Sequence, residues 1–349
     1  MEKPKIITRE DLTHLIIDKA EVRGFLKKLR YKPEVSNQKR TITGADLAVP
    51  EVITGIILDE VERQSRLLPF VHLSHFKGRA RQAIAVTISE AVWTELCEAE
   101  NEITLDLREV KLDAYKVSGF FVICDSVKES VDPVLLEELI RSIGGAIAKA
   151  VDKAILYGTG LKMPYGICTR LVQTEKPNDW DDDRPAWEDL HTSNILTLDL
   201  DDETGEAFFA PLTDALAVAE PEFSENGLFW AMNRKTHRHI LAKAGAYDFE
   251  AELNRMPILG GAIIDFDSSV IPDNQIIGGY GANYIMGERS GVHLAESKHY
   301  YFLQDQTVYK ASGYYDGMPA GGSSFVVVRF DNTAPTTSAT FATPRPIGG

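Results

Sequence analysis

The feature that most constrains this chain is one long helix, which the sequence predicts between Asp132 and Gly158. Asp132 is a favourable N-cap, Pro133 suits the first helical position, and Gly158 stops the helix. Apolar residues recur between them at three- to four-residue spacing: Leu136, Ile140, Ile143, Ile147, Ala150, Val151 and Ala154. About 25 residues make a rod of about 37 Å, longer than most globular helices. Small residues in its middle would let another element approach closely: Gly144, Gly145, Ala146 and Ala148.

The second constraint is a long β-hairpin, predicted over residues 71–115. Apolar residues alternate with small or polar ones on both sides of a polar stretch, Glu98 to Glu102, and these apolar residues are Ile84, Val86, Ile88, Ile103, Leu105 and Leu107. The alternation shifts phase at Val110, which indicates a β-bulge. An isolated hairpin of this kind is only marginally stable in water, so we expect its order to depend on a partner surface.

The remaining segments mix helices and strands, so the predicted fold class is α+β. Apolar residues from Ile53 to Val61 predict a helix that ends near Pro69, and the polar stretch Gln173 to Glu206 predicts a surface loop. Near the C-terminus the sequence predicts strands at His299–Phe302, Thr307–Ala311 and Phe325–Phe330, turns at Asp316–Gly317 and Gly321–Gly322, and an extended tail from Thr333.

Charge is distributed unevenly along the chain. The formal net charge of −15 argues against a free-standing nucleic-acid binder, because phosphate contacts need clustered Lys and Arg. Residues 1–40 nevertheless hold eleven Lys or Arg against six Asp or Glu, a net charge of +5 that leaves −20 for residues 41–349. Their apolar spacing predicts a basic helical segment. No apolar run approaches the roughly 20 residues that a membrane span requires.

Candidate chemical sites are weak. The glutamates of the hairpin and the Asp-rich stretches near Asp181 and Asp201 lack an apolar pocket or the glycine of a calcium loop. His72 with His75, and His237 with His239, lack a third ligand nearby. Cys97, Cys124 and Cys168 form no metal or disulfide motif, and dinucleotide, phosphate-binding and serine-nucleophile motifs are missing. We therefore predict no catalytic, cofactor-binding or metal-binding residues.

The order of these features resembles the major capsid proteins of tailed bacteriophages, which share the HK-ninety-seven fold. The resemblance covers residues 41–332, and its most specific part is the run from Val151 to Gly160 followed by Pro164-Tyr165-Gly166-Ile167. Other matching stretches are Gly44 to Pro50, Trp93 with Glu95, Val110 to Val117, Asp125-Ser126, Trp230 to Thr236, Gly278 to Tyr280, Tyr284, Gly287 to Arg289, Phe302, Asp305, Tyr309, Asp316-Gly317 and Phe325-Val326.

The resemblance implies a complete domain plan. It consists of a basic N-terminal helical segment (1–40), an N-terminal arm (41–70), an extended β-hairpin loop (71–115), a peripheral domain with the long spine helix and a β-sheet (116–163 and 290–332), an axial domain (164–289), and a C-terminal tail (333–349). The expected function is self-assembly, as hexamers and pentamers, into the icosahedral head that encloses double-stranded DNA. Apolar area buried between subunits would drive it, with the arm, hairpin and tail distributing that area over several neighbours.

The resemblance also implies locations and partners. The protein would belong to the virion, be assembled in the host cytoplasm, and meet portal and scaffolding or decoration proteins. The hairpin would lie over a neighbouring subunit, and its charge division, basic at the base and acidic at the tip, calls for a receiving surface that is basic or at least free of carboxylates. The interface candidates are Lys77, Arg79, Arg81, Trp93, Glu98, Glu100 and Glu102. The candidates to face DNA are Lys19, Arg23, Lys27, Lys28 and Arg30, for which an ordinary solvated helix face is an equal alternative.

We also consider two alternative functions, together with proteolytic maturation and crosslinking, which occur in some relatives. An encapsulin-type compartment resembles the same fold but encloses a protein cargo, and a metal-dependent hydrolase would use the Asp-rich loops. Residues 1–43 precede Gly44 where many relatives carry a longer scaffolding region, so we expect no proteolytic maturation. Some members crosslink a loop lysine to a neighbour's asparagine. Lys77 and Asn332 are conceivable partners, although the buried carboxylate that such a bond needs cannot be located from sequence.

Overall fold

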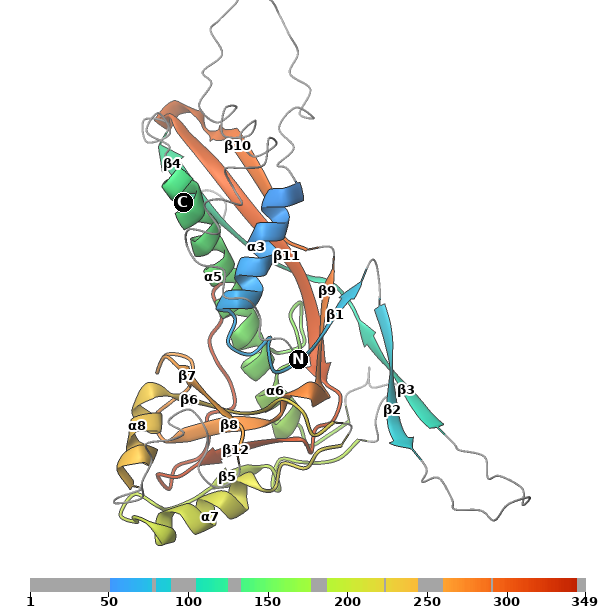
Figure 1. Cartoon of the computed structure of the whole chain (residues 1–349), viewed down its shortest axis with the longest axis vertical. Coiled ribbons are helices and arrows are strands. Elements are labelled where there is room, and N and C mark those ends of the chain that lie inside the picture. Colours follow the sequence, from blue (N-terminus) through green and yellow to red (C-terminus); the bar gives the residue numbers. More distant parts are fainter. Residues whose placement is uncertain are drawn as a thin grey trace, which may run out of the picture. The chain divides into compact units, whose positions relative to one another are not determined.

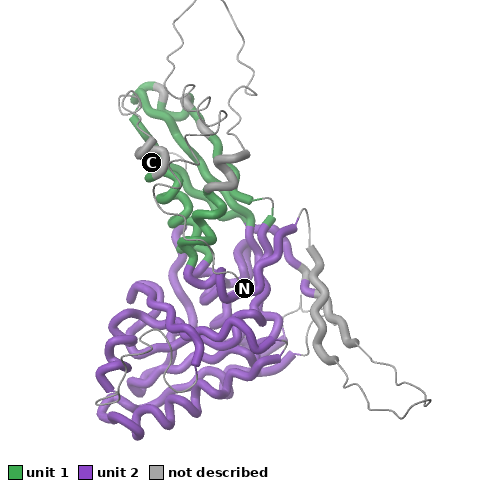
Figure 2. Tube along the Cα trace, in the orientation of Figure 1, with its two compact units in different colours: residues 1–65, 116–151, 289–314 green, residues 66–115, 152–288, 315–349 purple. Residues whose placement is uncertain are grey.

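The computed structural model describes residues 51–76, 80–88, 105–124, 133–176, 187–222, 224–243, 260–289 and 291–343. The chain divides into two compact units, which Figure 2 distinguishes by colour. Unit 1 comprises Met1–Ser65, Lys116–Val151 and Arg289–Tyr314, and unit 2 comprises Arg66–Tyr115, Asp152–Glu288 and Tyr315–Gly349. The mixed α+β class is confirmed. Within the described ranges, no helix is both long and apolar enough to cross a bilayer.

Two helices pack together in the described part of unit 1. Helix α5 spans Pro133–Tyr157, so both of its predicted ends are confirmed, and α3 spans Glu51–Gln64. The stripe of α5 is buried at Ile140, Ile143, Ile147 and Val151. A Cβ atom added at Gly144 would lie 2.8 Å from Glu60 Cγ, and one at Gly145 would lie 2.4 Å from Gln64 Oε1. The small residues in the middle of α5 therefore admit α3, as predicted.

Polar contacts secure α3 at the same place. The Glu60 side chain is 4% exposed, and its carboxylate accepts hydrogen bonds from Arg63, with Nη2 to Oε1 at 2.6 Å, and from Gln64. The Gln64 amide also donates to the carbonyl oxygen of Arg141 at 2.8 Å. A buried carboxylate is costly unless it is paired. These hydrogen bonds therefore offset the cost of burying Glu60 where the two helices approach closely.

A five-stranded sheet contains β1 (His72–Phe76), β9 (Tyr284–Arg289), β11 (Gln306–Pro319) and β10 (His293–Tyr301) in that order, with β4 (Tyr115–Cys124) also pairing with β11 (Figure 1). A short 3₁₀ turn, η2 (Phe302–Gln304), joins β10 to β11. The predicted turn at Asp316–Gly317 is wrong, because both residues lie inside β11. They pair with Gly287 and Met286 of β9, and this long-range pairing outweighs the local turn preference of Asp-Gly.

Unit 2 contains a second sheet, in the order β5 (Ile195–Thr197), β12 (Phe325–Arg329), β8 (Gln275–Tyr280), β6 (Leu228–Asn233) and β7 (Ala262–Phe266). Helix α7 (Glu206–Leu216) packs against β12, and α8 (Arg234–Lys243) packs against β6 and β7. The core of this unit includes Phe208, Trp230, Met232, Val328 and Phe330. Two shorter elements are α6 (Ile167–Val172) and the 3₁₀ turn η1 (Gly281–Asn283).

The position of β12 differs from the predicted grouping of 290–332 with 116–163. β12 hydrogen-bonds in parallel to β5 and antiparallel to β8, so it belongs to the sheet formed by residues from the 164–289 segment. The physical reason is that Val326, Val328 and Phe330 pack into the same core as Phe208. An apolar strand is predictable from composition alone, but the sheet that it joins depends on distant residues.

The predicted hairpin is confirmed in its described strands, β2 (Ala80–Ile88) and β3 (Leu105–Leu112), which pair antiparallel. The register shifts between Ala85 and Thr87. The bulge therefore lies at Val86 in the outgoing strand, and not near Val110 in the returning one. The extra residue in β2 compensates the phase difference between the two strands that the sequence pattern shows. Residues 89–104 lie outside the described part of the chain.

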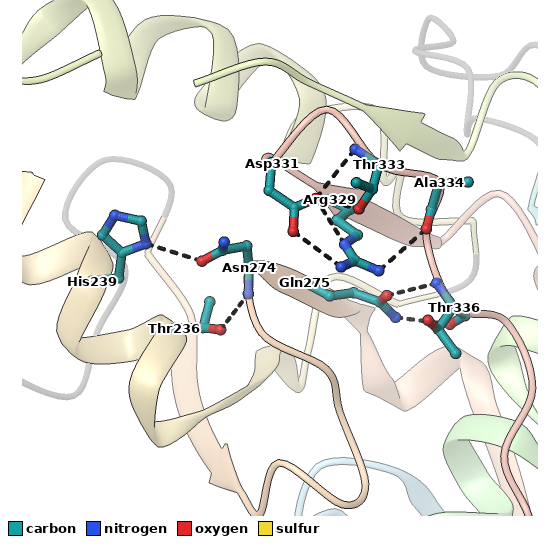
Figure 3. A network of polar contacts seen from close by, with 9 residues as sticks. All are labelled: Thr236, His239, Asn274, Gln275, Arg329, Asp331, Thr333, Ala334 and Thr336. Carbon is teal, nitrogen blue, oxygen red and sulfur yellow. Dashed lines mark hydrogen bonds and ion pairs between the residues drawn. The ribbon is translucent and has the colours of Figure 1, made fainter. Parts of the chain in front are cut away.

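The tail after β12 is extended and held by a polar network (Figure 3). Arg329 donates to both carboxylate oxygens of Asp331 at 2.8 and 3.0 Å. Partial burial opposes ionisation of Asp331, but hydrogen bonds from Arg329 and Thr333 lower its pKa. Gln275 binds the backbone of Thr336 twice, donating to its oxygen at 2.9 Å and accepting from its nitrogen at 2.7 Å.

Further along the tail, Lys153 donates to the carbonyl oxygen of Thr340 at 2.6 Å and lies 5.3 Å from the ring centroid of Phe341. All of these partners belong to unit 2. The tail is therefore tied to its own subunit as far as Phe341.

The α3–α5 contact yields a first prediction. Replacing Gly144 with Val places a branched side chain against the buried Glu60, and overpacking of this kind costs about 1–3 kcal/mol. We expect a lower thermal unfolding midpoint for the unassembled subunit. Gly119→Val is the matched control, because nothing lies within 4 Å of a Cβ at Gly119. Equal midpoints for the two variants would show that the helices are not in close contact.

The tail network yields a second prediction. Gln275→Glu keeps the shape of the side chain but replaces the amide that donates to Thr336 with an acceptor. Losing one hydrogen bond and leaving its acceptor unpaired costs about 1–2 kcal/mol, so amides in residues 333–343 should exchange hydrogen about tenfold faster. The exposed Gln304→Glu serves as control. Unchanged exchange in the Gln275 variant would mean that the tail is held elsewhere.

Candidate assembly surfaces

The β2–β3 hairpin is the main candidate for contact with another molecule. Among the described residues these two strands pair only with each other, as a two-stranded sheet. Arg81 lies in β2 with its backbone opposite Lys111 of β3. A free two-stranded ribbon is marginally stable. The hairpin therefore depends on how its base is fixed and on what its distal part contacts.

The base of the hairpin is fixed in a hydrophobic cluster of unit 2. Val110 and Leu112, at the end of β3, are 0% and 2% exposed and pack with Ile285 of β9 and Met318 of β11. Phe76, at the end of β1, packs against the same cluster. Both ends of the hairpin are therefore anchored by apolar burial, the dominant favourable term in folding.

One glycine makes this anchoring possible. A Cβ atom at Gly287 would lie 2.4 Å from Phe76 Cε1 and 2.8 Å from Leu112 Cδ1. Any larger residue at position 287 would therefore displace the side chains of Phe76 and Leu112, which hold the base of the hairpin. Sequence reasoning identified Gly287 as part of a family pattern and missed this contact. A glycine within a strand is the signal that could have suggested a close approach.

A buried carboxylate fixes the segment that leads into β1. Asp152 of α5 is 4% exposed, and its two oxygens accept hydrogen bonds from the backbone nitrogens of Arg66 and Leu67 at 3.0 and 3.2 Å. These nitrogens follow the end of α3, and the carboxylate holds the turn that directs the chain toward β1. Asp152 stands beside the apolar stripe of α5, which is the signal that a buried polar contact was needed.

Exposed apolar side chains mark a second candidate surface, in unit 1. Phe120 and Val122 of β4 are 56% and 37% exposed, and Tyr300 and Leu303, at the end of β10 and in η2, are 61% and 91% exposed. Single exposed apolar residues are ordinary, whereas several in one small unit suggest contact with another molecule.

Most of the predicted interface residues cannot be placed. Arg81 lies in β2, but its side chain is outside the described part of the structure. The other interface candidates, and all candidates to face DNA, lie outside the described residues: Lys77, Arg79, Trp93, Glu98, Glu100, Glu102, Lys19, Arg23, Lys27, Lys28 and Arg30. They remain predictions.

The histidine pairs bind separate partners within the protein. His237 Nδ1 lies 2.8 Å from Asp265 Oδ1, and His239 Nδ1 lies 2.9 Å from Asn274 Oδ1. The exposed His75 lies 3.2 Å from a carboxylate oxygen of the buried Glu288. Each of these three histidines therefore has a partner within the described part of the chain.

Two other residues that the sequence singled out can be placed. The Asn332 amide donates to Asp199 at 3.0 Å, which occupies the side chain considered for crosslinking. Its conceivable partner, Lys77, lies outside the described residues. Burial raises the pKa of the Cys168 thiol far above its ordinary value, which makes it unreactive.

Comparison with known proteins supports the resemblance found in the sequence. The family model described as "Phage capsid family" matches residues 44–330. A search of curated proteins found no match.

Solved structures also match. The capsid of an empty GTA particle matches with a TM-score of 0.52 and 15% identity, over 86% of this chain and 95% of that one. A chain from Mycobacterium phage Bobi matches with a TM-score of 0.53 and 12% identity, over 94% and 99%. One from Mycobacterium phage Adephagia matches with a TM-score of 0.51 and 12% identity, over 78% and 91%.

The structural matches are too dissimilar in sequence to show more than a shared fold. The family model is stronger, because it covers most of the chain in one continuous match. This chain therefore belongs to the phage capsid family, and it is a major capsid protein, a structural component of a virion and not an enzyme.

Proposed function

We propose that the chain assembles as hexamers and pentamers and that the resulting head encloses double-stranded phage DNA. The observation that carries this proposal is the β2–β3 hairpin, whose base is buried at Val110 and Leu112 while its strands pair with no other strand in the described part. A subunit that must complete such a ribbon on a neighbour is suited to a closed ring of identical copies.

In this proposal the two sheets have different roles. The strands β4, β10 and the first part of β11, with α5, form the peripheral domain. The sheet β5–β12–β8–β6–β7 with α7 and α8 forms the axial domain. Five or six copies of this domain would meet at the centre of a pentamer or hexamer. Helix α3 belongs to the N-terminal arm, and it lies against α5 through Gly144 and Gly145.

The contacts of the tail bear on which segments bind neighbouring subunits. The sequence suggested that arm, hairpin and tail all distribute buried area over neighbours. Gln275 and Lys153 instead bind the backbone of Thr336 and Thr340 of their own subunit. The proposal therefore assigns contact with neighbouring subunits mainly to the hairpin, with its distal part carrying the acidic charge.

The same proposal includes DNA as the content of the shell and further proteins as its partners. The net charge of +5 in residues 1–40 favours DNA inside the shell, because cations offset phosphate charge. An encapsulin-type compartment with a protein cargo would have no need of that basic segment. Portal and scaffolding or decoration proteins would complete the head.

The charge of the hairpin tip gives a third prediction. Reversing Glu98, Glu100 and Glu102 to Lys should impair shell assembly, because like charges that meet at an interface cost several kcal/mol. The helix content of the subunit, measured by circular dichroism, should stay almost unchanged. Negative-stain microscopy and light scattering would report the yield of shells.

Asp201, Asp202 and Glu203 provide the control. They are exposed, and reversing all three to Lys changes the net charge by the same amount. That variant should assemble normally. Normal shells from the tip variant would show that the charge of the tip has no part in docking, and loss of folding would place the hairpin inside the core.

The basic segment gives a fourth prediction. Replacing Lys19, Arg23, Lys27, Lys28 and Arg30 with Gln should weaken DNA binding by the unassembled subunit and flatten its dependence on salt, because each phosphate contact steepens that dependence by about 0.9 in the logarithmic slope. Lys149→Gln with Lys162→Gln is the control. An unchanged slope would identify the segment as a solvated helix face.

A further inference from the structure

Asn226 is exposed just before β6, and it is the only asparagine in the sequence that is followed by glycine. Asparagine is among the chemically labile residues. Its side-chain carbonyl carbon and the next backbone nitrogen are close along the chain, and a bond between them closes a succinimide ring. Such intramolecular reactions are favoured because the reacting groups are already held together. Gly227 has no Cβ atom to shield its nitrogen, so the ring closure at this pair is unhindered.

The contacts of Asn226 leave this reaction open. Its side-chain nitrogen and its backbone nitrogen both donate to the Ser224 hydroxyl at 3.2 Å. Both contacts are exposed, so water competes with them and they hold the amide weakly. Within the described residues, no hydrogen bond engages the Gly227 nitrogen. The attacking nitrogen therefore loses no partner when it reacts.

Asn332 is a useful comparison because it is exposed as well. Its amide donates to Asp199 at 3.0 Å, and the following nitrogen, that of Thr333, donates to Asp331 at 3.2 Å. Thr333 is also branched at Cβ, which crowds its nitrogen. Exposure is thus shared by the two asparagines, and the unhindered, unengaged neighbouring nitrogen belongs to Asn226.

We propose that Asn226 is a site of spontaneous covalent modification in the folded subunit. The Gly227 nitrogen forms a bond to Cγ of Asn226, its proton passes through water to the side-chain nitrogen, and ammonia leaves. Water then opens the succinimide at one of its two carbonyl carbons. Opening at Cγ gives aspartate, and opening at the backbone carbonyl gives isoaspartate, in which the chain continues through the side chain. The net reaction consumes water and releases ammonia, and it is independent of shell assembly.

The modification acts on a tightly packed part of unit 2. The Gly227 carbonyl accepts a hydrogen bond from the Gly281 nitrogen at 3.0 Å, and the Asn226 carbonyl accepts one from the Ala282 nitrogen at 3.3 Å. A Cβ atom at Gly227 would lie 2.3 Å from the carbonyl oxygen of Phe70, so the backbone has little room to move. Isoaspartate lengthens the backbone by one methylene group, and these contacts cannot all persist.

Ageing of the purified full chain tests the proposal. The protein is incubated at alkaline pH, which favours loss of the proton from the attacking nitrogen, and is then digested under mildly acidic conditions. Mass spectrometry should show two acidic products at Asn226, and a protein isoaspartyl methyltransferase should label one of them. The converted fraction should be at least about tenfold larger than at Asn332, a ratio that corresponds to a barrier difference of about 1.4 kcal/mol.

Two controls define the outcomes. A denatured sample of the same chain should convert at Asn226, and Asn226→Gln should remove the signal because glutamine would have to close a larger ring. An Asn226 that stays intact in the folded chain while it converts in the denatured one would overturn the proposal. Aspartate without isoaspartate would also overturn it, since direct hydrolysis gives aspartate alone. Equal conversion at Asn332 would reject the role of the glycine.

Hydrogen exchange tests the consequence for the fold. In the isoaspartate form, the amides of Gly281 and Ala282 should exchange about fivefold faster than in fresh protein, as expected for the loss of one hydrogen bond of ordinary net strength. Freshly prepared Asn226→Asp is the control, because it adds the charge without lengthening the backbone, and it should exchange at the original rate. Equal exchange in the isoaspartate form and the fresh protein would reject the predicted disruption of these contacts.

Discussion

The structure depends on one element, helix α5, to which several other segments are attached. In unit 1 its glycines Gly144 and Gly145 admit α3 at close range, and Glu60 and Gln64 form the polar contacts there. In unit 2 its last turns provide Asp152, which binds the backbone leading into β1, and Lys153, which holds the tail. A long helix with a buried stripe gives a rigid support for segments that would be poorly ordered alone.

The base of the hairpin is held by contacts within its own subunit. Asp152 fixes the chain before β1, and the cluster around Val110 and Leu112 fixes β3. The base of the hairpin is therefore specified by contacts within the subunit. In the proposed assembly, the rest of the hairpin would be stabilised by a neighbouring subunit, so that a folded subunit presents a contact that a neighbour completes.

Local signals were sufficient to predict some elements. The N-cap, proline and glycine around α5 gave both of its ends, and period-two alternation gave β2 and β3, because each depends on residues close in sequence. Features that depend on distant residues were missed or misplaced. Asp316–Gly317 was assigned to a turn because its pairing with β9 is not visible locally, and β12 was grouped with the wrong segment because its sheet partners lie far away in the chain. The contacts of Gly287 and Asp152 escaped sequence reasoning for the same reason, and most interface candidates stayed predictions because they lie outside the described residues.

We infer that this chain is a shell subunit that completes its fold contacts on neighbouring copies. Negative-stain microscopy of the purified protein, combined with light scattering, would check this. We expect closed shells or ring-shaped capsomers at micromolar concentration. A uniform monomer of 38.7 kDa, with no larger species under any assembly condition, would contradict it.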